Sequence, residues 1–193
     1  MTDMSKLVNF MMGWSVMPSW FALGAIPIMH AVAYNRITTT FEPMMEDQGL
    51  NFLQQVISQY TGFDVNGDRM ALAAILVSLL LQMVSFYFFL IVGSAKGVDN
   101  MYPRQHRPTD STLAGRLYAA HLNQAESFPG LAASVLASVA TGNGAAAAPM
   151  AWVHIFFRVL YWFCYAFNLP SLRTVTFVCG FDSNLLIFLK ALR

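Results

Sequence analysis

The chain has 193 residues, of which 56% are hydrophobic and 11% are charged, and its formal net charge at pH 7 is +1. Soluble domains carry roughly 25% charged residues, so most of this surface cannot face water. A charge so close to zero also excludes the basic surface that nucleic-acid binding needs. The composition therefore predicts an integral membrane protein, and the length of its apolar runs predicts that it is all-α.

The first apolar segment covers residues 7–34 and carries no Asp, Glu, Lys or Arg. A helix of about 20 mostly apolar residues crosses the hydrocarbon core, so this segment is long enough to span. Pro18 and Pro27 would each kink or interrupt such a helix. We expect an extra, kinked N-terminal span here, with a helix lying in the membrane interface as the alternative.

Residues 35–69 form a polar connection in which acidic side chains outnumber basic ones. The acidic residues are Glu42, Glu46, Asp47, Asp64 and Asp68, against Arg36 and Arg69. Its second half is amphipathic and would either rest on the bilayer or cover the bundle. Residues 1–69 are thus predicted to be a hydrophobic segment followed by an acidic, partly amphipathic loop.

Residues 70–193 are predicted to form a four-helix membrane domain. The spans are expected at 70–95, from about Thr112 to 140, at 150–168 and at 171–192. The turns between the last three are TGNGAAAAP (141–149) and the NLPS stretch that begins at Asn168. Cys164 and Cys179 lie inside apolar runs, which favours buried free thiols over a disulfide scaffold.

Loop charges predict the orientation of this domain. Between residues 96 and 116 lie Lys96, Arg104, Arg107 and Arg116 against Asp99 and Asp110. Loops rich in Lys and Arg stay in the cytosol, so we expect this loop to be cytosolic and residues 35–69 to lie outside. Lys190 and Arg193 would then fall on the outer side, a modest departure from the rule.

Polar residues of three predicted helices are spaced so that they share faces near the cytosolic end. Residues three, four or seven apart lie on one face of a helix. These residues are Arg116, Asn123 and Glu126 in the second span, Arg158, Tyr161 and Tyr165 in the third, and Arg173 with Thr174 in the fourth. Ionisable residues at membrane depth tend to face the bundle interior or a wet cavity. The pattern predicts an arginine-rich pocket for a polar anionic ligand, with interhelical pairing alone as the alternative.

Asp182 lies midway along the last predicted span, where a charge is costly. It is nine residues from Arg173, about half a turn around the helix, so the two cannot face one site within a subunit. A structural hydrogen bond, pairing with a neighbouring subunit or the N-terminal helix, and general-acid catalysis all stay open. His30 is expected to form a hydrogen bond at a helix end, and a lone histidine predicts no metal site.

Three stretches of the chain resemble the MAPEG family, membrane-associated proteins in eicosanoid and glutathione metabolism. They are DNMYPR (99–104), GRLYAAHLNQAESFP (115–129) and RVLYWFCYAFNLPSLRT (158–174), and the resemblance extends over residues 71–193. It implies a four-helix bundle assembled as a homotrimer. It also implies that glutathione binds between neighbouring subunits at the cytosolic side, usually of the endoplasmic reticulum.

The resemblance also implies roles for individual residues. Asn123 and Glu126 stand where the family contacts glutathione, and Glu126 would pair with its α-amino group. Arg158 and Tyr165 resemble ligand-binding residues, with Arg116 and Tyr161 beside them on the same stripes. Arg173 resembles the arginine placed near the thiol, and the hydroxyl of Thr174 stands where it can contact the sulfur.

The expected function is that of a glutathione-dependent transferase or isomerase for a lipophilic electrophile. Arg173 would lower the pKa of the bound thiol from its ordinary value of about 8.5, so that more of it is thiolate. Two departures from the family's pattern favour other activities: Ala119 and Leu122 replace two arginines common in the family, and Phe177 replaces a tyrosine of prostaglandin E synthase. One alternative is a thiol-independent isomerase or cyclase that uses Glu126, Arg173 or Asp182 as acid and base. The other is a non-catalytic lipid-binding protein.

Overall fold

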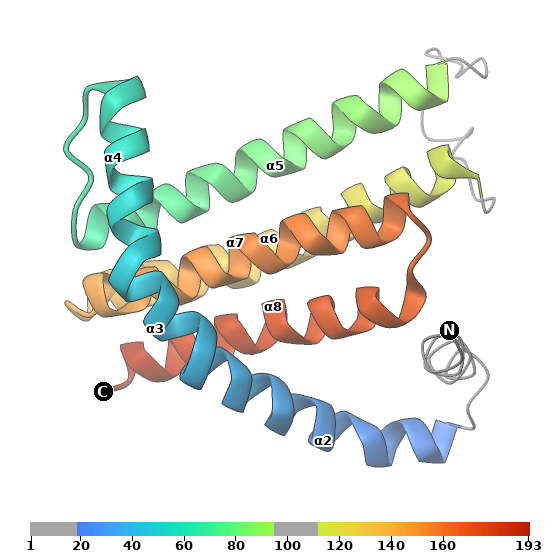
Figure 1. Ribbon diagram of the computed structural model, residues 1–193, viewed down its shortest axis with the longest axis horizontal. Helices are drawn as coiled ribbons and strands as arrows, with labels where there is room; N and C mark the ends of the chain where they lie inside the picture. The colour runs from blue at the N-terminus through green and yellow to red at the C-terminus, as the bar shows by residue number, and fades with distance from the viewer. Residues whose placement is uncertain (1–18, 95–111) are drawn as a thin grey trace, which may run out of the picture.

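The computed structural model describes residues 19–94 and 112–193, and within these ranges all regular structure is helical. The helices are α2 (Ser19–Arg36), the π-helix η2 (Ile37–Phe41), α3 (Glu42–Met44), the π-helix η3 (Met45–Gly49), α4 (Leu50–Thr61), α5 (Asp68–Ser94), α6 (Leu113–Ala140), α7 (Gly144–Ala166) and α8 (Pro170–Ala191). Figure 1 shows α5 to α8 running side by side, with α2 alongside α8 and α4 crossing one end of the bundle. The all-α prediction is confirmed.

Three of the described helices are long and apolar enough to cross a membrane, at Asp68–Gly93, Gly144–Ala166 and Pro170–Ala191. The helix α6 has 28 residues, which is about 42 Å of length, and it packs against α5, α7 and α8. It carries the polar stripe of Arg116, Asn123 and Glu126. The predicted four-helix bundle is therefore present, with Arg116 and Asn123 of α6 partly buried in it and Glu126 exposed.

The N-terminal helix α2 packs against α8. Ala33 of α2 and Ile37, the first residue of η2, belong to the buried core. Pro27 lies inside α2, as predicted. The residues 7–18 of the predicted first span, with Pro18, lie outside the described residues. That this segment crosses the membrane stays a prediction, because α2 is not among the three described helices that are long and apolar enough to do so.

The predicted loop at 35–69 is mostly helical, which corrects the sequence-based expectation. Helical structure continues without a break from Ser19 to Thr61, and Gly62, whose φ is +70°, caps the end of α4. The face of α4 formed by Leu50, Leu53 and Ile57 packs against the core, while its Tyr60 is exposed. The amphipathic stretch thus covers the bundle. Burial of its apolar face stabilises a helix that the polar composition of this segment alone did not predict.

Local sequence explains where the last three helices begin and end. The Thr112 hydroxyl accepts a hydrogen bond from the Gly115 N–H at 3.3 Å and caps α6, as its predicted start requires. The following turn covers only residues 141–143, shorter than the predicted 141–149, because the alanines after Gly144 are strong helix formers. Asn168, at φ +56°, makes the turn into α8, and asparagine tolerates this left-handed conformation. Both cysteines are buried and free, as predicted.

Candidate functional site

A series of polar contacts around Arg158 joins α5, α6 and α7, and Arg158 is only 2% exposed. The guanidinium donates from Nε to Gln124 Oε1 at 2.9 Å and from Nη2 to Asn123 Oδ1 at 3.0 Å. The Asn123 amide in turn donates to Glu126 Oε2 at 3.4 Å, and the Gln124 amide donates to Ser78 Oγ at 3.5 Å. The predicted meeting of Asn123, Glu126 and Arg158 is thus seen within one subunit.

Two tyrosines extend this chain of contacts toward α8. The Arg158 guanidinium carbon lies 4.4 Å from the centroid of the Tyr161 ring, and the hydroxyls of Tyr161 and Tyr165 are 3.5 Å apart. The guanidinium carbon of Arg173 lies 4.7 Å from the centroid of the Tyr165 ring. Six predicted residues, from Glu126 to Arg173, therefore form one continuous series across three helices.

Arg116 and Thr174 make contacts of a different kind. Arg116 donates from Nε to the Tyr165 carbonyl at 3.0 Å and from Nη2 to the Ala166 carbonyl at 3.2 Å. These carbonyls belong to the last turn of α7, where regular helical partners end, although the Tyr165 carbonyl also accepts from the Asn168 N–H at 3.1 Å. The exposed Thr174 donates its hydroxyl to the Pro170 carbonyl of its own helix at 3.1 Å. Roles for Arg116 and Thr174 in cofactor binding stay predictions.

Asp182 lies apart from this series, as its position half a turn from Arg173 predicts. Its Oδ1 is 2.6 Å from Nδ1 of His30. The sequence predicted His30 at a helix end, but the residue lies within α2. Of the three roles left open, this contact bears out a structural hydrogen bond at a helix interface, made by pairing with the N-terminal helix, while general-acid catalysis stays a prediction. The second oxygen, Oδ2, is buried and has no hydrogen-bond partner among the described residues.

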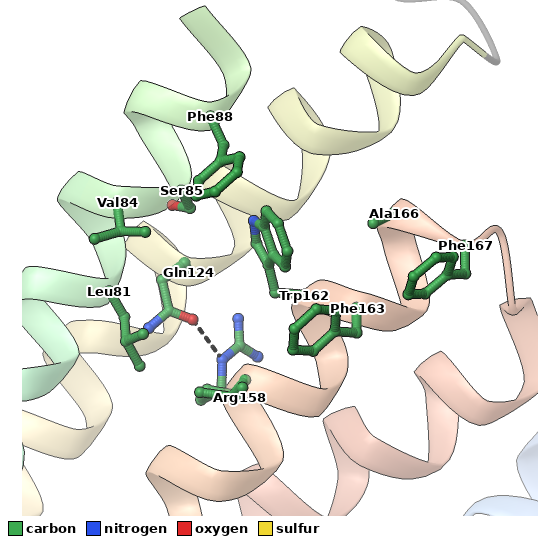
Figure 2. Close-up of a pocket in the computed structure, with 11 residues that line it drawn as sticks. Leu81, Val84, Ser85, Phe88, Gln124, Arg158, Trp162, Phe163, Ala166 and Phe167 are labelled. Atoms are coloured by element: carbon green, nitrogen blue, oxygen red, sulfur yellow. Dashed lines mark hydrogen bonds between the residues drawn. The ribbon is translucent and has the colours of Figure 1, made fainter. Parts of the chain in front are cut away.

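A cavity of about 460 Å³ lies between α5, α6 and α7, beside Arg158. Its lining residues are Leu81, Val84, Ser85, Phe88, Gln124, Arg158, Val159, Trp162, Phe163, Ala166 and Phe167. Figure 2 shows Arg158 and Gln124 joined at one side of the cavity and the aromatic side chains around the rest. The volume falls within the range of about 300–1,000 Å³ found for small-molecule sites.

Sequence reasoning missed Gln124 and Ser78, which hold the network to α5. Gln124 is buried at 5% exposure and Ser78 is fully buried. The sequence feature that could have identified these two residues is a single hydroxyl or amide side chain within an apolar run, because a buried polar side chain requires a hydrogen-bond partner. His121 also contacts α5, where its Nδ1 lies 3.3 Å from Ser85 Oγ.

The sequence model of the MAPEG family matches residues 70–193. The chain belongs to the MAPEG family. This membrane-protein family includes glutathione transferases and isomerases as well as members without enzymatic activity. No curated protein and no solved structure matches the chain. The match contains α6 to α8, all of α5 except its first two residues, and every predicted site residue, whereas α2, α3, α4 and His30 lie outside it.

Proposed function

We propose that this MAPEG protein is a glutathione-dependent transferase or isomerase that acts on a lipophilic electrophile in the membrane. The observation that carries the proposal is the continuous series of polar contacts from Glu126 through Arg158 and the two tyrosines to Arg173. The series lies entirely within the family-matched region. It offers a carboxylate at one end, arginines at the middle and far end, and neutral donors between them.

These groups suit the functional groups of glutathione. The exposed Glu126 would pair with the α-amino group, while the amide of Asn123 and the hydroxyl of Tyr165 would hydrogen-bond to the peptide. Arg173 is half-buried, and no ion pair or hydrogen bond from its guanidinium is found in the ranges that the structure describes. It would therefore be available to stabilise a thiolate, which favours ionisation of the thiol.

In the proposed reaction, the thiolate attacks an electrophilic carbon or oxygen of the membrane-dissolved substrate. With an epoxide, a carbon–sulfur bond forms, a carbon–oxygen bond breaks, and the new alkoxide takes up a proton. The product leaves as a conjugate. An isomerase would instead break the bond to sulfur after rearrangement and return the thiol.

We also propose the homotrimer, with glutathione bound between subunits at the cytosolic face of the endoplasmic reticulum. The exposure of Glu126 and Thr174 on a single subunit supports a site completed by a neighbour. Large apolar side chains of α8 are exposed on one subunit as well, at Phe177, Phe181 and Leu185, and a membrane or another copy would cover them. The orientation rests on the charges of residues 96–116, most of which lie outside the described residues.

A second candidate is a thiol-independent isomerase or cyclase. It is favoured by Ala119 and Leu122, which stand where many family members have arginines. The contact of Asp182 with His30 would then place the acid–base pair on α8 and α2, away from the Arg158 network. A non-catalytic lipid-binding role predicts binding of apolar molecules without turnover.

The test uses the full chain in lipid nanodiscs, with glutathione binding measured by equilibrium titration and conjugation followed with 1-chloro-2,4-dinitrobenzene. We expect saturable glutathione binding, and we expect Arg173→Leu to lower kcat by about a hundredfold or more while assembly, measured by light scattering, is unchanged. Arg193→Leu, at an exposed terminal arginine, is the matched control and should retain activity. Wild-type turnover in Arg173→Leu would remove Arg173 from the mechanism. Product formation without any thiol would select the second candidate.

A further inference from the structure

The helix α4 has three faces of different chemistry, because residues three or four apart lie on one face of a helix. The face that packs against the core of the bundle carries Leu50, Leu53 and Ile57. A second face, the apolar ridge, carries Phe52, Val56 and Tyr60. A third face, the polar edge, carries Asn51, Gln55 and Ser58. Packing against the bundle uses the first face, so the other two have different surroundings.

The apolar ridge is largely uncovered in the part of the chain that the structure describes. Phe52 is 65% exposed and Tyr60 is 82% exposed, while Val56 between them is half-buried. Phe63, in the turn that follows α4, is 71% exposed. Exposed apolar side chains that gather along one edge mark a surface for a protein or a membrane.

The helix α4 lies at the depth where the bundle leaves the hydrocarbon core. Figure 1 shows it crossing the bundle at the end where α5 and α7 begin. At this end Lys190 of α8 donates to Glu42 of α3 and, at 3.0 Å, to the Ala146 carbonyl of α7. The helix α5 has 27 residues and is about 40 Å long, whereas the hydrocarbon core is about 30 Å thick. The ends of the bundle therefore extend into the head-group layers.

The chain itself keeps α4 close to that layer. Residues 62–67 join α4 to Asp68, the first residue of a candidate membrane span, and six residues reach at most about 22 Å. The surface of this span is apolar and exposed next to the link, at Leu72 and Leu76. The apolar ridge and Phe63 thus continue a surface of the membrane domain.

The side chains suit a lipid surface better than water. Tyrosine is enriched where a membrane meets water, because its ring is apolar and its hydroxyl reaches the polar layer. An interfacial helix buries an apolar face at the boundary between head groups and acyl chains and keeps a polar face in water. The apolar ridge and the polar edge of α4 supply these two faces, and the core face attaches the same helix to the bundle.

Charge decides which lipids fit. Among residues 46–69 the exposed acidic side chains outnumber the basic ones, with Glu46, Asp47, Asp64 and Asp68 against Arg69. Anionic lipids attract clusters of Lys and Arg, and this surface would repel them. Zwitterionic head groups carry no net charge, so they avoid that repulsion.

We propose that α4 is an interfacial helix whose apolar ridge, together with Phe63, is inserted among zwitterionic lipids at the end of the bundle where α5 begins. Its polar edge faces water. The segment before α5 is then held by the bilayer as well as by the bundle. Because α4 lies outside the family-matched region, this assignment is independent of the proposed cofactor.

The experiment measures the depth of single nitroxide labels on the full chain in phosphatidylcholine nanodiscs. Cys164→Ala and Cys179→Ala first remove the two buried thiols. The labelled variants are Phe52→Cys, Tyr60→Cys and Phe63→Cys on the apolar side, Asn51→Cys and Gln55→Cys on the polar edge, and Leu80→Cys, exposed midway along α5, as the deep reference. Collisions of each label with oxygen, which concentrates in the bilayer, are compared with collisions with a water-soluble nickel chelate.

We expect the labels on the apolar side to lie about 5–10 Å into the boundary between head groups and acyl chains. The labels on the polar edge should collide freely with the nickel chelate. Equal nickel exposure on both sides of α4 would place the apolar ridge in water and overturn the proposal. Exclusion of both oxygen and nickel at Phe52→Cys would place the ridge against a second copy of the chain, which would also overturn it. Deeper insertion on addition of phosphatidylserine would refute the assignment to zwitterionic lipid.

A second measurement needs no label. Phe52→Gln combined with Tyr60→Gln removes the apolar ridge but keeps helix-forming residues, so amide hydrogen exchange across residues 50–61 should become about fivefold faster or more. The matched control, Asn51→Gln combined with Gln55→Lys, changes two exposed side chains on the polar edge and should leave the exchange unchanged. Wild-type exchange in the ridge variant would show that the core face alone holds α4, and the proposal would fail.

Discussion

The contact between His30 and Asp182 makes a quantitative prediction about how α2 is held to the family domain. The Asp182 side chain is 5% exposed and its one hydrogen-bond partner among the described residues is His30, at 2.6 Å. His30→Leu would leave the carboxyl group buried without that partner. Removing one member of a buried pair costs about 3–5 kcal/mol, and because the His30 side chain is 35% exposed we take the lower end, about 3 kcal/mol.

The assay is equilibrium unfolding of the full chain in mixed micelles with increasing sodium dodecyl sulfate, with a double-mutant cycle. We expect His30→Leu to lose about 3 kcal/mol, while adding Asp182→Leu to it restores most of the stability, because two apolar side chains replace the pair. Tyr34→Leu, one turn further along α2 and exposed, is the control and should change stability little. A loss below about 0.5 kcal/mol in His30→Leu, or additive losses in the double variant, would refute the reasoning.

Three further substitutions test the packing of the bundle and the contacts at the end of α7. Gly144→Ala should destabilise the protein by about 1–3 kcal/mol in the same assay, because the added Cβ would overlap the side chains of Asp68 and Val139. Gly180→Ala should be neutral or stabilising, since its Cβ would make only ordinary contacts, the nearest at 3.6 Å to Arg158 Cδ, and alanine favours helix. Arg116→Met should lower the free energy of unfolding by about 1–3 kcal/mol, because it removes the two hydrogen bonds from Arg116 to carbonyls at the end of α7. It should also speed amide hydrogen exchange there. Equal exchange in Arg116→Met and wild type would contradict this role of Arg116.

The polar series of the candidate site was predictable because helix geometry is simple. The spacing of Asn123 and Glu126 along α6 specifies one face of that helix. The cost of a polar group in a membrane favours a buried position for Arg158 on α7, and Arg158 is 2% exposed, whereas Glu126 at the edge of the series is exposed. The partners of these residues were not predictable. Gln124 lies about 100° around the helix from Asn123, and only the packing of α6 between α5 and α7 makes both amides accept from one arginine.

The contacts of Arg116 and His30 could not be derived from the sequence for a related reason. Arg116 shares a face with Asn123, but its guanidinium reaches the carbonyls of Tyr165 and Ala166, which stand opposite only once α6 and α7 are packed. His30 pairs with a residue 152 positions away. Periodicity describes one helix at a time, so it contains no information about which residues of two helices meet.

The sequence by itself determined the membrane class, the all-α architecture, the four helices of the bundle and the family, because apolar length and residue spacing are local properties. Tertiary structure decided that residues 37–61 are helical and cover the bundle, that α2 joins α8 through His30 and Asp182, and that an apolar cavity opens beside Arg158. Each of these depends on the angle and register at which separate helices pack. Those quantities follow from the fit of whole side-chain surfaces, which no single stretch of sequence specifies.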